Sequence, residues 1–167
     1  MKPAVKPFET SRLFDASRDK VWKAWTEAER MKQWWGPKGF VVKRLEIDLR
    51  PGGTLLYCLQ APDGTEMWGK MVFREIVKEQ KLVFINSFSD PKGGTTRHPW
   101  SPDWPLEMHS TITFESVGKQ TRVGIRWIPV DSSTELEKKT FDEGRASMNQ
   151  GWGGTMDQLN GYLGSSK

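Results

Sequence analysis

The stretch "MNQGWGGTMDQLNGYL", residues 148–163, decides the fold of this chain. Its apolar residues recur at steps of three and four, which is typical of an α-helix with one buried face. They are Met148, Trp152, Met156, Leu159 and Leu163. Acidic residues and Ser, Thr and Asp capping candidates precede this stripe from residue 131 onward, so we expect one long helical run there. We expect the helix to span at least residues 145 to 162.

A helix with a single apolar stripe must bury it against another layer, and the middle of the chain predicts that layer. From Phe40 to Val130 the apolar period is two, as in strands with one buried face. Turn signals such as "PGG" at 51–53 divide this run, and strands joined by hairpins are antiparallel. We therefore predict an α+β fold in one domain, residues 1–167. A curved seven-stranded antiparallel sheet wraps around the C-terminal helix, and two short helices follow the first strand.

The segment "MKQWWGPKGF", residues 31–40, carries two adjacent tryptophans. Neighbouring residues on a helix point about 100° apart, so Trp34 and Trp35 cannot both fill one apolar stripe. One ring should pack under the short helix, while Trp35 reaches the interior between the sheet and the long helix. The alternative is that both rings only pack the core around a hinge.

Composition narrows the class of protein. The net charge is +4 without any run of Lys or Arg, which argues against nucleic-acid binding. Cys58 is the only cysteine, so no intrachain disulfide can form. No apolar leader and no 18-residue apolar stretch occur, so we expect a cytoplasmic protein that does not enter membranes.

Several segments together carry a family resemblance: "VWKAWTEAERMKQWWGP", "DLRPGG", "LVFINSFSD", "TRHP", "WPLEMHSTITF" and "GWGGTMDQL". They resemble the helix-grip (SRPBCC) superfamily of START and birch-pollen-allergen-like proteins. Within it, they are similar to the branch related to the heat-shock protein 90 ATPase activator and the calicheamicin self-resistance protein. The resemblance covers nearly the whole chain and implies a sheet that grips the long helix, often with a cavity between them. Because many members have no assigned activity, it implies the fold more than the function.

Strand alternation predicts the apolar face that meets the long helix, and a ligand pocket between the two. The face should contain Met67, Met71, Phe73, Phe84, Met108, Ile112, Ile125 and Trp127. The residues expected to bind the ligand are Trp35, Met71, Phe84, Met108, Trp127, Trp152, Gly154 and Met156. Gly151, Gly153 and Gly154 each destabilise a helix interior by roughly 1 kcal/mol relative to alanine. They either make room for a ligand or permit close helix–sheet packing or a helix break.

The segment "SDPKGGTTRHPWSPDWP", residues 89–105, is longer than most loops without regular structure, and such loops often serve as lids. Trp100 and Trp104 should fold back over the open end of the grip, because exposing two indole rings is unfavourable. Arg97 and His98 would hold the loop down or meet a polar end of the ligand. A mobile lid and a static plug both remain open.

The sequence contains no recognisable catalytic, metal or cofactor motif. His98, Asp103, Glu107 and His109 lie within twelve residues, but their spacing matches no known ligand pattern. His109 should also lie on the opposite face from Met108. Cys58 has no histidine nearby in sequence, as expected for an inert buried thiol. We therefore assign no catalytic residue, no metal and no cofactor.

Three functions are compatible with these patterns. The first, which we favour, is non-catalytic binding of a small, largely apolar molecule whose identity the sequence does not reveal. The second is a co-chaperone-like module that binds a protein partner, as the resemblance implies. The third is a cyclase- or hydrolase-type enzyme that uses the same cavity, although we can assign no acid or base to it.

Overall fold

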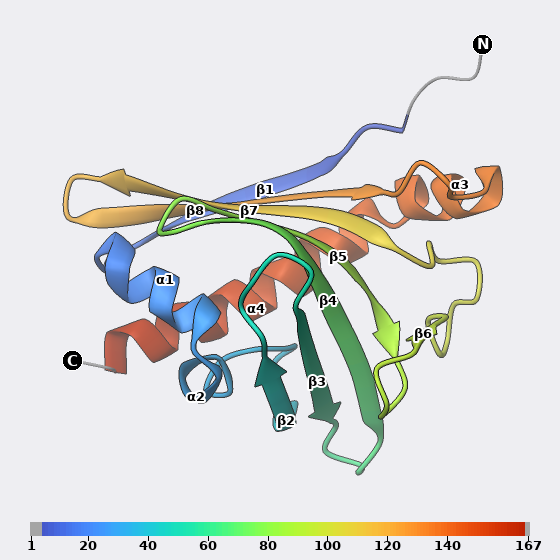
Figure 1. The fold of residues 1–167 in the computed structure, drawn as a ribbon, viewed down its shortest axis with the longest axis horizontal. Helices are drawn as coiled ribbons and strands as arrows, with labels where there is room; N and C mark the ends of the chain where they lie inside the picture. Colours follow the sequence, from blue (N-terminus) through green and yellow to red (C-terminus); the bar gives the residue numbers. More distant parts are fainter. Residues whose placement is uncertain (1–4, 166–167) are drawn as a thin grey trace.

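The computed structural model describes residues 5–165, and its elements alternate as the sequence patterns predict (Figure 1). The strands are β1 (Phe8–Phe14), β2 (Val41–Ile47), β3 (Thr54–Gln60), β4 (Glu66–Val77), β5 (Lys81–Ser89), β6 (Thr95–Thr96), β7 (Met108–Val117) and β8 (Gln120–Pro129). The helices are α1 (Arg18–Thr26), α2 (Ala28–Met31), α3 (Glu135–Glu143) and α4 (Arg145–Ser165). The two short helices follow the first strand, as expected.

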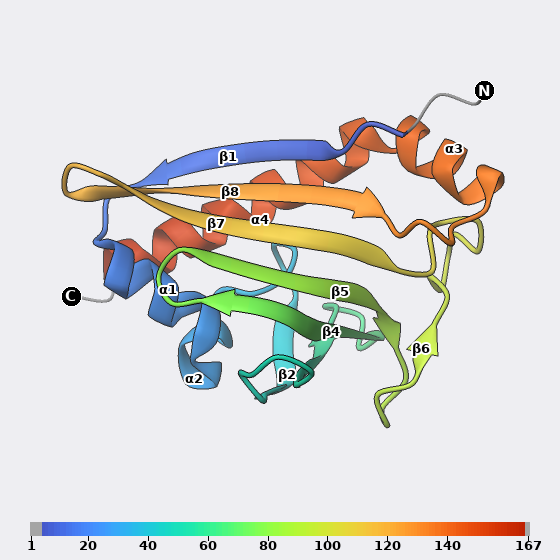
Figure 2. The same cartoon turned by 45° about the horizontal axis from the view of Figure 1, so that its top comes forward.

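One antiparallel sheet forms the first layer. Its strand order is β1-β8-β7-β5-β4-β3-β2, and β6 pairs only with β5. The sheet curves, so that β3 and β2 turn under the same face that α4 crosses (Figures 1 and 2). The predicted seven-stranded helix-grip arrangement is confirmed. The two-residue strand β6 is an addition, and it lies inside the segment expected to be an irregular loop.

The C-terminal helix lies across the concave face of the sheet, and α4 includes the whole predicted span of residues 145 to 162. The expectation of one continuous helical run from residue 131 is wrong, because the run is interrupted at Gly144. Its N–H donates to both the Thr140 and Phe141 carbonyls, closing α3. A Cβ at Gly144 would lie 2.9 Å from the ring of Trp104, so the glycine, which lacks one, leaves room for that ring.

An aromatic cluster joins α4 to the rest of the core. The Trp152 ring lies 6.3 Å from Trp25 on α1, 6.0 Å from Trp35 and 5.4 Å from Trp127 on β8, measured between ring centroids. Trp34 is buried on the other side, where its Nε1 donates to the Ala24 carbonyl over 3.0 Å. The adjacent tryptophans therefore serve different surfaces: Trp34 packs against α1, and Trp35 lies between α4 and the sheet.

Replacing Trp34 with phenylalanine should destabilise the protein more than the same change at Trp35. Trp34→Phe leaves the Ala24 carbonyl at the end of α1 without its donor, which costs about 1–3 kcal/mol. Trp35 Nε1 makes no hydrogen bond of normal geometry to any described residue and only faces the Tyr57 hydroxyl, so Trp35→Phe loses mainly ring packing. Urea unfolding of both variants measures the difference. Equal losses of unfolding free energy would contradict the assignment.

Candidate ligand cavity

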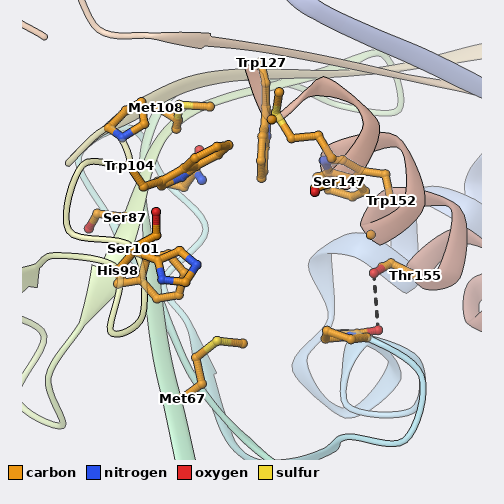
Figure 3. Close-up of a pocket in the computed structure, with 18 of the residues that line it drawn as sticks. Met67, Ser87, His98, Ser101, Trp104, Met108, Trp127, Ser147, Trp152 and Thr155 are labelled. Atoms are coloured by element: carbon orange, nitrogen blue, oxygen red, sulfur yellow. Dashed lines mark hydrogen bonds between the residues drawn. The ribbon is translucent and has the colours of Figure 1, made fainter. Parts of the chain in front are cut away.

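A cavity of about 600 Å³ lies between the concave sheet, the loop before β7 and helices α3 and α4 (Figure 3). Pockets of 300–1,000 Å³ are the usual size for drug-sized ligands. Strands β3, β4, β5, β7 and β8 contribute Tyr57, Leu59, Met67, Met71, Phe84, Asn86, Ser87, Phe88, Met108 and Trp127. Loops and helices contribute Trp35, Gly36, Pro37, His98, Ser101, Trp104, Pro105, Thr140, Glu143, Gly144, Ser147, Met148, Gly151, Trp152 and Thr155.

The structure brings most of the predicted ligand-binding residues to this cavity. Its walls include Trp35, Met71, Phe84, Met108, Trp127 and Trp152. Gly154 and Met156 do not line it. Helix α4 faces the cavity with Ser147, Met148, Gly151, Trp152 and Thr155, a stripe that excludes residues 154 and 156. Met156 instead lines a separate cavity of about 140 Å³ beside β1.

The three clustered glycines of α4 do not share one role. Gly151 lines the main cavity and Gly153 the smaller one, whereas Gly154 lines neither. A Cβ built at any of the three meets no other group within 4 Å. Close helix–sheet packing therefore requires none of them, and the helix break lies at Gly144 instead. Only Gly151 leaves open space beside the main cavity.

Charge is nearly absent from the cavity wall. Of its lining residues within the described range, only Glu143 has an ordinarily ionised side chain. Glu143 is exposed, and its Oε1 lies 3.9 Å from Lys139 Nζ. Burial raises the pKa of Tyr57 to about 12, so its phenol is neutral. Burial also lowers the pKa of His98. Because His98 Nδ1 accepts the Trp100 N–H over 3.0 Å, the neutral ring carries its proton on Nε2. The cavity is thus a neutral, mainly aromatic and methionine-lined space.

The ring of Tyr57 lies over the neighbouring strand β4, because of the register between β3 and β4. Tyr57 pairs directly with Gly69 of β4, and a Cβ at Gly69 would lie 2.2 Å from the phenol oxygen. Only glycine lets the ring occupy this position, which agrees with the close approach that an isolated glycine in a strand indicates. The phenol consequently lies over β4 at the cavity wall, where the Trp35 ring contacts Tyr57 edge-on at 5.7 Å.

Asn86 is a cavity residue that the sequence reasoning missed. It lies on β5 between Phe84 and Phe88, on the face that lines the cavity. Its Oδ1 accepts a short hydrogen bond from the hydroxyl of Ser110, a fully buried residue of β7. That bond orients the amide and leaves its NH₂ group available. The available signal was a polar residue at an alternating position within an otherwise apolar strand face, "FINSF".

The loop before β7 closes one side of the cavity through a buried carboxylate. Glu137 of α3 accepts hydrogen bonds from the Leu106 N–H at 2.7 Å and from Arg97 Nη1 at 2.8 Å. It also completes a capping box with Thr134. Trp104 packs against Phe141 with ring centroids 6.0 Å apart and lines the cavity, as does His98. Arg97 therefore holds the loop to α3.

Trp100 departs from the prediction for this loop. Its side chain is 64% exposed and does not fold back over the cavity. The space between the loop and the helices is occupied by Trp104, whose ring fits against the helix break at Gly144. Trp100 instead lies 6.0 Å from His98, edge to face on the outer side of the loop.

A family model described as activator of Hsp90 ATPase homolog 1-like protein matches residues 15–164. The chain belongs to this family. The match covers nearly all of the helix-grip domain, from the end of β1 to the last turn of α4. No protein with a curated description is significantly similar to the chain.

Solved structures share the fold of this family member over its full length. A Nitrosomonas europaea protein is 23% identical, with a TM-score of 0.74 over 97% of this chain and 96% of its own. An Arthrobacter aurescens protein is 25% identical, with a TM-score of 0.74 over 96% of this chain and 87% of its own. The AHSA1 protein of Silicibacter pomeroyi is 16% identical, with a TM-score of 0.72 over 97% of this chain and 100% of its own.

Neither metal-binding groups nor membrane-spanning helices are found in the part of this family member that the structure describes. Within residues 5–165, no three His, Cys, Asp or Glu side chains gather closely enough to hold a metal ion. No helix in the same range is both long and apolar enough to cross a membrane.

Glu137→Gln should destabilise this domain more at neutral pH than in acid. Burial alone would raise the pKa of Glu137, but hydrogen bonds from Thr134, Leu106 and Arg97 outweigh it and lower the pKa to about 2. The ionised carboxylate therefore stabilises the fold above its ordinary pKa of 4.5, and this stabilisation is lost as pH falls toward 2. We expect a loss of about 2–3 kcal/mol at pH 7.

Urea unfolding at pH 7 and pH 3 checks this expectation, since the gap between wild type and Glu137→Gln should narrow in acid. Glu143→Gln is the control, because that exposed carboxylate makes only a 3.9 Å contact with Lys139. A gap that is the same at both pH values would show that Glu137 is not held as a carboxylate.

Proposed function

We propose that this protein binds a small, largely apolar molecule in its cavity without catalysing a reaction on it. The observation that carries the proposal is the preformed space of about 600 Å³ with aromatic and methionine walls and neutral polar groups. A ligand that buries about 300 Å² of apolar surface there gains about 7 kcal/mol before association costs. Methionines such as Met67, Met71 and Met108 adapt their shape to different ligands.

The chemistry of the cavity supports binding over catalysis. His98 uses Nδ1 to accept the Trp100 N–H, and no carboxylate orients its ring among the described residues. With Nδ1 engaged and its proton on Nε2, the ring has no free basic nitrogen to act as a general base. Cys58 is buried outside the cavity lining, and burial raises the pKa of its thiol, which disfavours the nucleophilic thiolate. These features weigh against the cyclase- or hydrolase-type alternative.

A protein partner such as a chaperone is the second candidate. The description of the family supports it, and the exposed Trp100 ring adds one observation. Exposed tryptophans are frequent anchors in protein interfaces. Native mass spectrometry of protein purified from its own cells separates the candidates. A retained small molecule supports cavity binding, whereas a retained protein and an empty cavity support the second candidate.

The neutral dye N-phenyl-1-naphthylamine should bind in the main cavity, and the Gly151→Leu substitution should weaken that binding. Gly151 lines the cavity, so a leucine there would displace about 55 Å² of buried ligand surface, equivalent to about a tenfold higher Kd. Gly154→Leu is the matched control. Gly154 is also a helix glycine with open space around it, but it does not line the cavity. Dye fluorescence titrations give both Kd values. Equal Kd values, or no dye binding by the parent, would contradict cavity binding.

The loop of residues 89–105 should act as a plug that remains closed when the dye leaves. Arg97 and the Leu106 N–H both bind the buried Glu137, and Trp104 fits against Gly144, so opening breaks several contacts at once. We expect amide hydrogen exchange in residues 90–100 to be the same with and without N-phenyl-1-naphthylamine. Faster exchange without the dye would identify a lid instead.

A further inference from the structure

We propose that Tyr57 and Asn86 make the cavity selective for neutral ligands that carry a hydrogen-bond acceptor, such as an ester or ketone oxygen. The same cavity would reject carboxylates, including fatty acids of equal length. This inference rests on the proposed function, because it specifies the ligand class of the site described above. It assigns a recognition role to two of the polar residues that line the cavity, both of them on the strands of the sheet.

Rejection of anions follows from the charges around the cavity. No Lys or Arg belongs to its lining within residues 5–165, and the nearest ionised group, Glu143, is itself negative. Arg97, which holds the adjacent loop, already pairs with the buried Glu137. Protonating His98 at Nδ1 would break its bond from the Trp100 N–H. A buried carboxylate would therefore lack a counter-charge, which costs several kcal/mol.

Tyr57 supplies the first donor. Its ring is fixed over Gly69, which admits no side chain beneath the phenol. Within the described chain, no residue accepts a hydrogen bond from the Tyr57 hydroxyl, and the Trp35 indole that faces it is a donor. The phenol proton is therefore available to a ligand oxygen.

Asn86 supplies the second donor on the neighbouring strand. Ser110 is fully buried and donates to Asn86 Oδ1, so the amide oxygen is already engaged. The amide NH₂ is what remains for a ligand, and it too is a donor. Met71 pairs with Asn86 across β4 and β5, so apolar side chains surround this amide. Two donors without a cation favour an oxygen acceptor that is neutral.

Displacement of N-phenyl-1-naphthylamine at pH 8 by methyl dodecanoate and by dodecanoate tests the proposal. The two competitors have the same alkyl chain and differ in charge. We expect the ester to displace the dye at least tenfold more effectively than the acid. Tyr57→Phe should raise the Kd of the ester about three- to tenfold relative to the dye Kd measured in the same variant, since one hydrogen bond to the ester is lost. Tyr162→Phe is the control, because Tyr162 lies outside the cavity lining.

A double variant, Asn86→Leu with Ser110→Ala, removes the amide and its buried partner together, so no unpaired hydroxyl remains. The double variant should weaken ester binding by a similar factor. Equal displacement by acid and ester would overturn the selectivity while leaving cavity binding intact. Unchanged ester affinity in Tyr57→Phe and in the double variant would overturn the two recognition roles. Failure of the dye to bind the parent would instead overturn the proposed function.

Discussion

The packing of Trp152 is the interaction on which the rest of the structure depends. This one ring meets Trp25 from α1, Trp35 from the segment after α2 and Trp127 from β8. Helix α4 contains several glycines, each of which lowers intrinsic helix stability, so tertiary contacts must hold it in place. The Trp152 cluster therefore joins the C-terminal helix to both the N-terminal helices and the sheet, and it sets their spacing.

That spacing also explains the position of the main cavity. The tryptophan cluster fills the region beneath α1, where Trp25 and Phe114 meet edge to face. Toward α3, no comparable aromatic cluster fills the space between the sheet and the helix within the described chain. The helix run breaks at Gly144, Trp104 enters beside it, and the buried Glu137 fixes the loop that carries Trp104. Ring packing therefore holds the end of the domain near α1, whereas the hydrogen-bonded carboxylate of Glu137 holds the end near α3, where the cavity lies.

Periodicity predicted the parts of the molecule that depend on local pattern. The period-two run predicted the antiparallel sheet, and the helical stripe predicted α4, because burial of one face governs both. Contacts between distant segments escaped prediction. The Trp104 ring fits against Gly144 only in the folded structure, and the helical stripe alone did not show on which side Met156 would lie. Asn86 was missed because the search for a pocket selected apolar residues and passed over an amide on the same face.

The proposed ligand selectivity rests on residues other than those that stabilise the fold. Trp152 and Trp35 are both core and cavity wall, so changing them would alter the fold and the pocket together. Tyr57 and Asn86 project from strands whose backbone ladders are complete without their side chains. Substitutions at such positions leave strand register unchanged, because register depends on the alternating apolar set and the turns. Structures only 16–25% identical share this fold, as expected when the sheet and helix are specified by pattern. On that scaffold, the ligand selectivity proposed for the cavity rests on a few polar side chains of the strands.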